Sequence, residues 1–358
     1  MDPVTHALAG SLAAKVVTRN STTDESSLHS RDPLIIAAIA GIFPDFDYLS
    51  FWINPLIFIA DWHRSFTHSL FMAPLWGLLL TIIMVTVLPR LRGSARSVYL
   101  YSVLGLLSHI LLDILTVYGT EIYYPLSDMS VSLATTFVID PYFTIIILLA
   151  LFISLQLHNR LPAFIGTALL LVYISFQWQL KLSAIQIAQD FGAERITIDS
   201  EITALPQPFS PLHWRMIVQR DQEYSTALLD ISGFSEKLFD NQASNNWYGL
   251  ITAYKGKGNL YWQDYSLFDL DPDNAPTSLA VWQHDDMEKF RQFAEFPVFY
   301  RFDESGSETC VWFTDLRYLI STMMPTFRYG MCRETDDSPW QLHRLRRLTE
   351  NNRQRINP

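Results

Sequence analysis

Residues 61–88 read DWHRSFTHSLFMAPLWGLLLTIIMVTVL. The second part of this stretch, residues 69–88, is an uncharged and mostly apolar run. About 20 such residues form a helix that crosses a bilayer core of about 30 Å. The first part places His63, Arg64 and His68 at the entrance to that run. Ionisable side chains are costly inside a membrane and tend to mark functional sites there, so the stretch predicts both a membrane span and a site at its start.

Other apolar segments extend this pattern along the first half of the chain. We expect four long spans, at residues 69–88, 98–117, 141–157 and 162–180. Two shorter apolar segments, at residues 5–17 and 34–43, precede them. Because these two are well below the length of a bilayer-spanning helix, we expect a half-inserted hairpin or partly buried helices.

The charges are unevenly distributed. Of 26 basic and 36 acidic residues, 9 and 11 lie at or before Lys181, so the remainder carries −8 of the formal net charge of −10. Hydrophobic residues make up 49% of the chain. This asymmetry predicts a membrane-embedded front and a water-soluble, acidic back. An acidic back also argues against a nucleic-acid partner, which needs clustered Lys and Arg.

From about Gly192 the pattern is that of a mixed soluble domain. Alternating runs at residues 213–220, 309–318 and 325–332 predict strands, and residues 286–296 have helical spacing. We expect residues 343–358 to form a solvated helix or a disordered end. The predicted fold is an α-helical membrane domain (four long spans plus two shorter N-terminal helices) over residues 1–181. An α+β soluble domain follows over residues 192–358.

The loops predict an orientation. Three arginines in residues 89–97 should place that loop in the cytoplasm. Alternation of the spans then puts residues 118–140 outside, together with His63, His68 and everything after Lys181. The α+β domain is therefore expected to be extracytoplasmic.

The two cysteines, Cys310 and Cys332, both fall in the back half. If this half is extracytoplasmic they can form one disulfide, because oxidising compartments allow it. The alternative is a pair of ordinary buried thiols. The sequence leaves both open.

Histidine and aspartate side chains recur in four groups within the apolar front. His109 and Asp113 are four residues apart, so a helix projects both from one face. His63 and His68 are five apart and would converge only at a turn. The seven candidate ligands are His6, Asp45, Asp47, His63, His68, His109 and Asp113.

Each of these residues also has a plain structural interpretation. A lone histidine in an apolar segment is usually a satisfied core residue, and Thr67 and Ser69 are expected to cap the coming helix. The predicted topology nevertheless brings all four groups to the outer side, which favours one shared site.

Mixed imidazole and carboxylate ligands suit Zn²⁺, with Mn²⁺ and Fe²⁺ as alternatives. Seven candidates exceed one tetrahedral centre, so either two ions are bound or some residues orient the ligands. Asp47 is a candidate ligand or general base. Arg64 is a candidate for holding an anionic group such as phosphate, and its alternative is a membrane-interface arginine.

These motifs resemble those of a known family. MDPVTHALAG, PDFDYL, HRSFTHSL and HILLDILTVYGTEIYYPLSD resemble, in this order, the motifs of the YdjM-like membrane proteins over roughly residues 1–180. The resemblance implies a metal-dependent hydrolase of the bacterial inner membrane with its metal at the quoted His and Asp positions. More loosely, the site is similar to zinc-dependent phospholipase C and P1-type nucleases, although the last acid is Asp113 rather than Glu.

The expected function is hydrolysis of a lipid or lipid-linked substrate, a phosphoester in particular, at the outer membrane–water interface. Membrane lipid is the expected partner, and the oligomeric state stays open. The alternative is a non-enzymatic membrane protein, either a metal or proton transporter or an assembly factor whose soluble domain binds a partner. A transporter predicts polar groups spread through the membrane depth, whereas a hydrolase predicts a cluster at one end.

Overall fold

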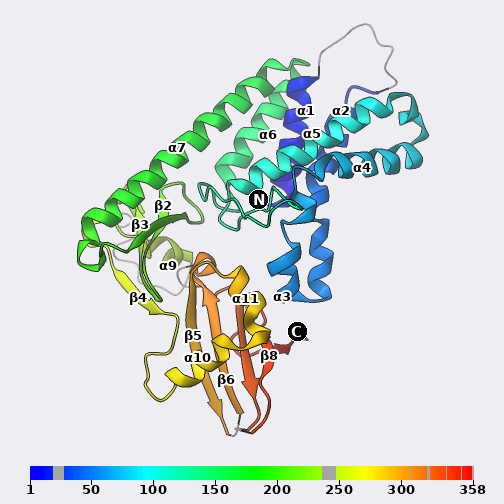
Figure 1. The fold of residues 1–358 in the computed structure, drawn as a ribbon. Coiled ribbons are helices and arrows are strands. Elements are labelled where there is room, and N and C mark those ends of the chain that lie inside the picture. The colour runs from blue at the N-terminus through cyan, green and yellow to red at the C-terminus, as the bar shows by residue number, and fades with distance from the viewer. Residues whose placement is uncertain are drawn as a thin grey trace. The chain divides into compact units, whose positions relative to one another are not determined.

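In the computed structural model, a helical N-terminal region precedes a β-rich α+β region, as predicted (Figure 1). The chain folds into two compact units. The first comprises Met1–Leu49 and Trp62–Gln179, and the second comprises Ser50–Asp61 and Leu180–Pro358. The second unit thus includes a short segment from within the helical region. The structure describes residues 1–18, 28–235, 247–306, 308–320, 323–335, 337–347 and 349–356.

Helix starts follow from local chemistry. Proline occupies the first turn of several helices, where its missing N–H costs nothing, and Asp2 and Asp140 accept hydrogen bonds as N-caps. The helices are α1 (Pro3–Val17), α2 (Asp32–Ile42), α3 (Pro55–Ile57), α4 (Ala73–Val87), α5 (Ala95–Ile114), α6 (Pro141–Gln156) and α7 (Leu161–Phe191). Between them lie the 3₁₀ helices η1 (Phe43–Trp52), η3 (Phe66–His68) and η4 (Pro89–Ser94) and the π-helix η2 (Phe58–Trp62).

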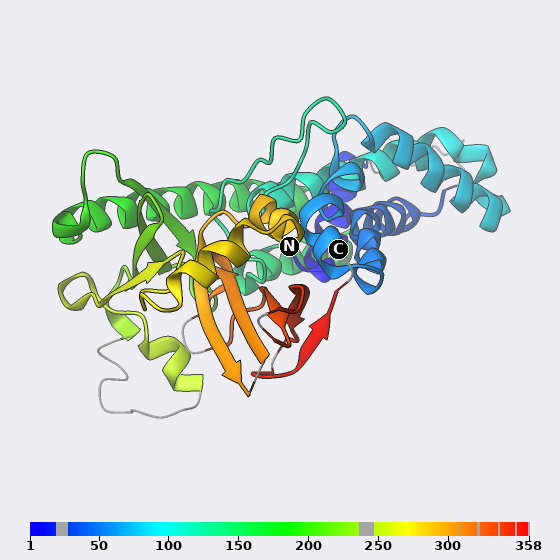
Figure 2. The same cartoon turned by 60° about the horizontal axis from the view of Figure 1, so that its bottom comes forward.

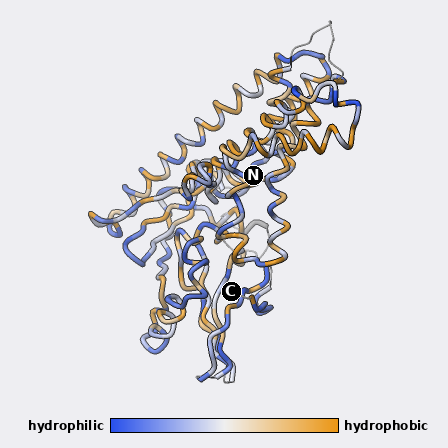
Figure 3. The backbone as a smooth tube through the Cα atoms, turned by 45° about the vertical axis from the view of Figure 1, so that its right-hand side comes forward, coloured by the Kyte–Doolittle hydropathy of each residue, from blue (hydrophilic) through white to orange (hydrophobic). Residues whose placement is uncertain are grey.

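Among the described residues, three helical stretches are long and apolar enough to cross a membrane, namely Asp32–Trp52, Pro89–Ile114 and Leu161–Phe191. A fourth is present if the bent pair Pro55–His68 and Ala73–Val87, with an angle of 76°, counts as one span. Figure 3 shows hydrophobic residues along most of the helices of this region. The length and composition of these helices are those of an integral membrane protein.

The helix lengths differ from the prediction in three places. Residues 34–43 alone are too short to span, but η1 continues α2 directly and the combined stretch reaches 21 residues. Conversely, residues 69–88 contain only the 15-residue helix α4, because η3 and an irregular turn occupy the chain before Ala73. Helix α6, with 16 residues, is also shorter than a long span.

Small residues let α1, α2 and α5 approach closely. A Cβ placed on Gly10 of α1 or Gly105 of α5 would lie 2.3 Å from the carbonyl oxygen of Ala37 in α2. Such close approach of backbones requires small residues at the helix interface. The packing brings His6 of α1 and His109 of α5 together, with their rings stacked at a centroid distance of 3.6 Å.

The described part of the α+β unit contains two antiparallel sheets (Figure 2). The end of α7 packs on the first sheet through Ala184 and Ala188, which join Trp214 and Met216 in one apolar cluster. The first sheet has the order β1 (Glu201–Pro206), β2 (His213–Arg220), β3 (Glu223–Asp230) and β4 (Trp262–Ser266). The second has the order β5 (Pro297–Ser305), β6 (Glu308–Asp315), β7 (Arg328–Arg333), β8 (Gln341–Leu345) and β9 (Arg353–Arg355).

The predicted strand at residues 213–220 coincides with β2, and the other two predicted strands overlap β6 and β7. Part of the predicted helix at residues 286–296 forms α11 (Glu288–Phe293). The expectation of a helical or disordered end after residue 343 is wrong for the described residues, because β8 and β9 pair with each other and complete the sheet. Cys310 and Cys332 are opposite each other on β6 and β7 and form a disulfide.

Candidate metal centre

Four side chains of the helical unit converge on one point. Asp45 comes from η1, His68 from η3, and His109 and Asp113 from α5, and one donor atom of each lies within 4.8 Å of the others. His68 Nε2 lies 3.4 Å from Asp113 Oδ2 and 3.8 Å from Asp45 Oδ1, and the corresponding distances from His109 Nε2 are 3.3 and 3.7 Å. Ligand atoms around tetrahedral zinc lie roughly 3.3–3.6 Å apart. The group therefore has the dimensions of a metal site.

Hydrogen bonds on the far side of each imidazole orient both rings. The Nδ1–H of His109 donates to the carbonyl oxygen of Gly41 at 2.6 Å. Nδ1 of His68 lies 2.9 Å from the hydroxyl of Thr67, which itself donates to Asp47 at 3.3 Å. A neutral imidazole protonated at Nδ1 carries its lone pair on Nε2. Both Nε2 atoms therefore face the centre as electron-pair donors, as in ligating histidines.

Several atoms at the centre have no hydrogen-bond partner within the part of the chain that the structure describes. They include His68 Nε2, His109 Nε2 and Asp113 Oδ2, all on fully buried side chains. An unsatisfied buried polar atom costs about 1–3 kcal/mol. A divalent cation bound by two imidazoles and two carboxylates would satisfy these atoms, so the residues present fit a metal ion.

His6 borders this group of four. Its Nε2 lies 3.2 Å from Asp113 Oδ1, whereas His68 and His109 contact Asp113 Oδ2. Neither ring nitrogen of His6 has a hydrogen-bond partner among the described residues, and the side chain is fully buried. The structure thus places the predicted ligand His6 beside the group and in contact with one of its members.

Asp47 and His63 form a pair next to the group. Nδ1 of His63 lies 3.2 Å from each carboxylate oxygen of Asp47. Asp47 also accepts a hydrogen bond from the backbone N–H of Arg64 at 3.3 Å. The rings of His63 and His68 meet edge to face at 5.9 Å between centroids. The donor atoms of Asp47 and His63 lie outside the convergent set, and their role as ligands stays a prediction.

Arg64 is buried against Asp113. Its Nη2 lies 3.1 Å from Asp113 Oδ1, its Nη1 donates to Thr116 Oγ1 at 2.6 Å, and its guanidinium lies over the ring of Tyr118. Arg64 has a φ of 63°, a region that bulky residues rarely occupy and that is common at functional sites. The guanidinium of Arg64, which we expected to hold an anionic group, is therefore paired with Asp113. Its Nε has no hydrogen-bond partner among the described residues.

The sequence did not indicate every residue of this site. Gly41 contributes a carbonyl oxygen, and no side-chain pattern reports such a role. Thr116 and Tyr118 follow Asp113 closely, and that proximity was the one available signal for them. Thr67, expected to cap a helix, instead connects Asp47 to His68. Ser69 does accept a hydrogen bond from a backbone N–H two residues later, but α4 begins only at Ala73.

All these residues lie at one end of the helices. His6 is near the start of α1, Asp45 follows the end of α2, and His109 and Asp113 lie in the last two turns of α5. The opposite end of α2 is marked by Asp32, which accepts a hydrogen bond from Arg90 of η4 at 2.9 Å. The candidate ligands therefore cluster at the end remote from the arginine-rich loop.

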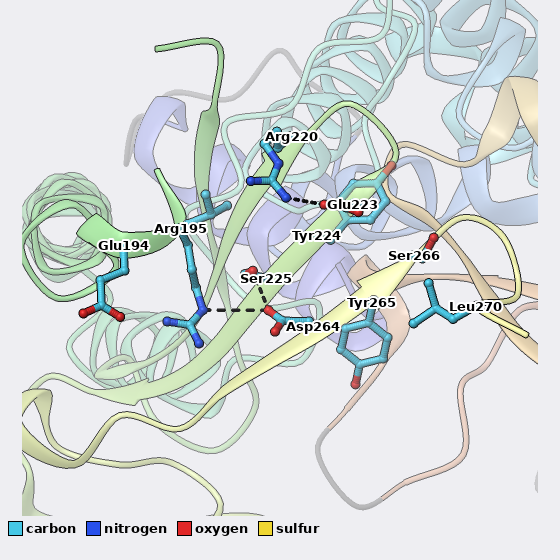
Figure 4. Close-up of a pocket in the computed structure, with 11 residues that line it drawn as sticks. Glu194, Arg195, Arg220, Glu223, Tyr224, Ser225, Asp264, Tyr265, Ser266 and Leu270 are labelled. Atoms are coloured by element: carbon cyan, nitrogen blue, oxygen red, sulfur yellow. Dashed lines mark hydrogen bonds and ion pairs between the residues drawn. The ribbon is translucent and has the colours of Figure 1, made fainter. Parts of the chain in front are cut away.

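The α+β unit contains a cavity of about 460 Å³ next to β2, β3 and β4 (Figure 4). Four of its charged groups form two ion pairs. Arg195 lies 3.8 Å from Asp264, which also accepts a hydrogen bond from Ser225, and Arg220 pairs with Glu223. It contains none of the predicted site residues.

A helical membrane region with a buried His/Asp cluster at one end defines a multi-pass membrane protein with a candidate metal site. The chain belongs to the YdjM inner membrane protein family, whose model matches residues 1–184, and the predicted resemblance is thereby confirmed. It is also similar to the uncharacterized protein YfhP of Bacillus subtilis (strain 168), with 28% identity over 145 residues. That alignment covers 40% of this chain and 42% of the relative. No solved structure matches.

Proposed function

We propose that this chain is a membrane-bound metal-dependent hydrolase that acts on a lipid or lipid-linked phosphoester at the outer membrane–water interface. The observation that carries the proposal is the convergence of Asp45, His68, His109 and Asp113 around buried atoms without hydrogen-bond partners among the described residues. Zn²⁺ suits this donor set, with Mn²⁺ and Fe²⁺ as alternatives. One ion fits the group of four, and His6 is the candidate ligand for a second.

The residues around the ion have separable roles. A divalent ion held by these residues would act as a Lewis acid and would lower the pKa of a bound water. Asp47 holds His68 in the ligating orientation through Thr67. Arg64 places a fixed positive charge beside Asp113, and its Nε is the atom that we propose to hold an anionic group of the substrate. Asp45, whose side chain is 18% exposed, connects the site to solvent.

A lipid substrate is supported by the side chains next to the ligands in sequence. Phe46 and Tyr48 flank Asp47 and are 63% and 51% exposed, and Phe71, three residues after His68, is 52% exposed. Aromatic side chains gather at membrane–water interfaces, where one end is apolar and the other wet. An amphiphile that reaches the site from the membrane would meet these side chains first.

The outer location is supported by two features. The ligands lie at the end of the helices remote from Arg90, Arg92 and Arg96, and basic loops face the cytoplasm. The disulfide between Cys310 and Cys332 suits an oxidising compartment. We therefore propose a membrane-embedded part over residues 1–181 and an extracytoplasmic α+β domain over residues 192–358.

The clustering favours an enzyme over a transporter. A metal or proton transporter requires ionisable groups along the permeation pathway. The seven candidate ligands instead lie at one end of the helices. This is the arrangement that hydrolysis at an interface needs.

Metal analysis of the purified full-length protein tests the proposal. Wild-type protein should contain at least one divalent ion per chain and hydrolyse phospholipid or phosphoester substrates in a chelator-sensitive reaction. His68→Ala and His109→Ala should each lose bound metal and activity, because each removes a ligand.

His29→Ala is the matched control, because His29 belongs to the same unit but its side chain is 73% exposed. It should retain metal and activity. Normal metal content and activity in both ligand variants would contradict the proposal.

A further inference from the structure

The two halves of the candidate metal site are connected by a segment that belongs to the other unit. Asp45 and Asp47 lie a few residues before Ser50–Asp61, and His63 and His68 lie within seven residues after it. Ser50–Asp61 is part of the α+β unit. Helical turns join it to the site on both sides, since η1 continues from Phe43 to Trp52 and η2 ends at Trp62. The connections along the chain are therefore short.

Within the α+β unit this segment is firmly held. Leu56 and Phe58 are 2% and 1% exposed, and α3 packs against α11 (Figure 1). The guanidinium of Arg344 lies 4.8 Å from the ring centroid of Phe51. Lys289 of α11 forms an ion pair with Asp61 at 3.0 Å. A cation–π contact, apolar burial and an ion pair thus hold the segment at its start, middle and end, respectively.

In the helical unit, Asp47 connects the two chain segments that flank Ser50–Asp61, here called the Asp45 arm (residues 45–49) and the His68 arm (residues 62–68). It accepts hydrogen bonds from His63, from the backbone N–H of Arg64 and from Thr67, and Thr67 orients His68. A shift of either end of Ser50–Asp61 would therefore change the position of Asp45 or His68, because each lies within seven residues of the segment. Ligand orientation at a metal site is sensitive to its supporting hydrogen bonds, and their loss typically costs 10–100-fold in affinity.

We propose that the α+β unit is a positioning element of the metal site, which sets the separation of the Asp45 arm and the His68 arm by holding Ser50–Asp61. Lys289 and Arg344 are thereby positioning residues, although neither is a metal ligand. Any partner or ligand that displaces this segment from the α+β unit would change metal affinity and so control the reaction. This inference rests on the proposed metal site.

The test uses the full chain and Co²⁺ as a spectroscopic probe of the site. A Gly-Ser-Gly-Ser insertion after Ile53, which is 78% exposed, lengthens Ser50–Asp61 between Phe51 and α3 and leaves α3 in place. We expect Co²⁺ affinity to fall by about tenfold and the visible absorption of the bound ion to change. The same insertion after Asp221, in the exposed turn between β2 and β3, is the matched control and should change neither quantity.

A charge exchange provides a second measurement. Lys289→Glu should weaken Co²⁺ binding by about two- to fivefold, as expected for one exposed ion pair, and the double variant Asp61→Lys/Lys289→Glu should restore it. Wild-type binding that persists unchanged in the Ile53 insertion and in Lys289→Glu would overturn this inference alone. A wild-type chain that binds no Co²⁺ would overturn the proposed metal site as well.

Discussion

At Asp47, one carboxylate accepts hydrogen bonds from three different groups of the segment that contains His63 and Thr67. The sequence predicted Asp47 as a site residue because it lies in FPDFDYL, and it predicted a turn there from Pro44. The hydrogen-bond path from Asp47 through Thr67 to His68 joins residues about 20 positions apart. No local spacing rule reports such a path, whereas the four-residue spacing of His109 and Asp113 did predict their shared face.

Asp47→Asn is a direct test of this orienting role. The amide keeps the shape of the side chain but replaces one acceptor oxygen by a donor, so the support of His68 through Thr67 is weakened. Metal affinity should fall by about 10–100-fold while the protein still folds. Titration with Zn²⁺ in a calorimeter measures the affinity, and circular dichroism checks the fold. An affinity equal to that of the wild type would exclude the orienting role.

At the scale of the element, helix identity was more predictable than helix length. Apolar runs identified most of the helices, but η1 extends α2 beyond the apolar pattern, through FPDFDYL. Hydropathy alone cannot report this extension because polar residues of the site interrupt it. Helix α4 begins at Ala73, later than the start of the predicted span at residue 69. The chain before Ala73 forms the turn that contains His68.

Close packing of α2 and α5 makes a specific prediction. In Gly105→Ala the new Cβ would meet the backbone oxygen of Ala37 at 2.3 Å, so the helices must separate. Because Gly105 lies one turn before His109, this variant should lose both thermal stability and metal affinity. We expect a destabilisation of about 1–3 kcal/mol, as for other overpacked sites.

Gly258→Ala in the α+β unit is the control for this prediction. A Cβ at Gly258 would have no other heavy atom within 4 Å. Thermal unfolding followed by circular dichroism and metal titration compare the two variants. Equal stability and equal metal affinity of Gly105→Ala and the wild type would show that the contact is not required.

For the whole molecule, composition and charge predicted the order of a membrane-embedded front and an α+β back. They could not predict that Ser50–Asp61 belongs to the α+β unit. That assignment depends on interactions with residues more than 200 positions away, such as Lys289. The loop charges did predict an orientation, and it can be tested directly.

Labelling of introduced cysteines with a membrane-impermeant maleimide reports this orientation. Leu270→Cys, at an 82% exposed position of the α+β unit, should be labelled in intact spheroplasts. Arg92→Cys, in η4, should be labelled only after the membrane is permeabilised. The native cysteines are paired in a disulfide and should not react. The reverse labelling pattern would place the α+β unit in the cytoplasm.

The placement of Ser50–Asp61 also has a consequence for biosynthesis. The ribosome makes Asp61 and Pro55 well before their partners Lys289 and Tyr329, which lie 228 and 274 residues later. At a synthesis rate of roughly 5–20 residues per second, Tyr329 is added roughly 14–55 seconds after Pro55. During this interval the apolar side chains of Leu56 and Phe58 have no native burial site. The candidate metal site therefore matures late, because its connecting segment gains its partners only after Lys289 and Tyr329 have been synthesised.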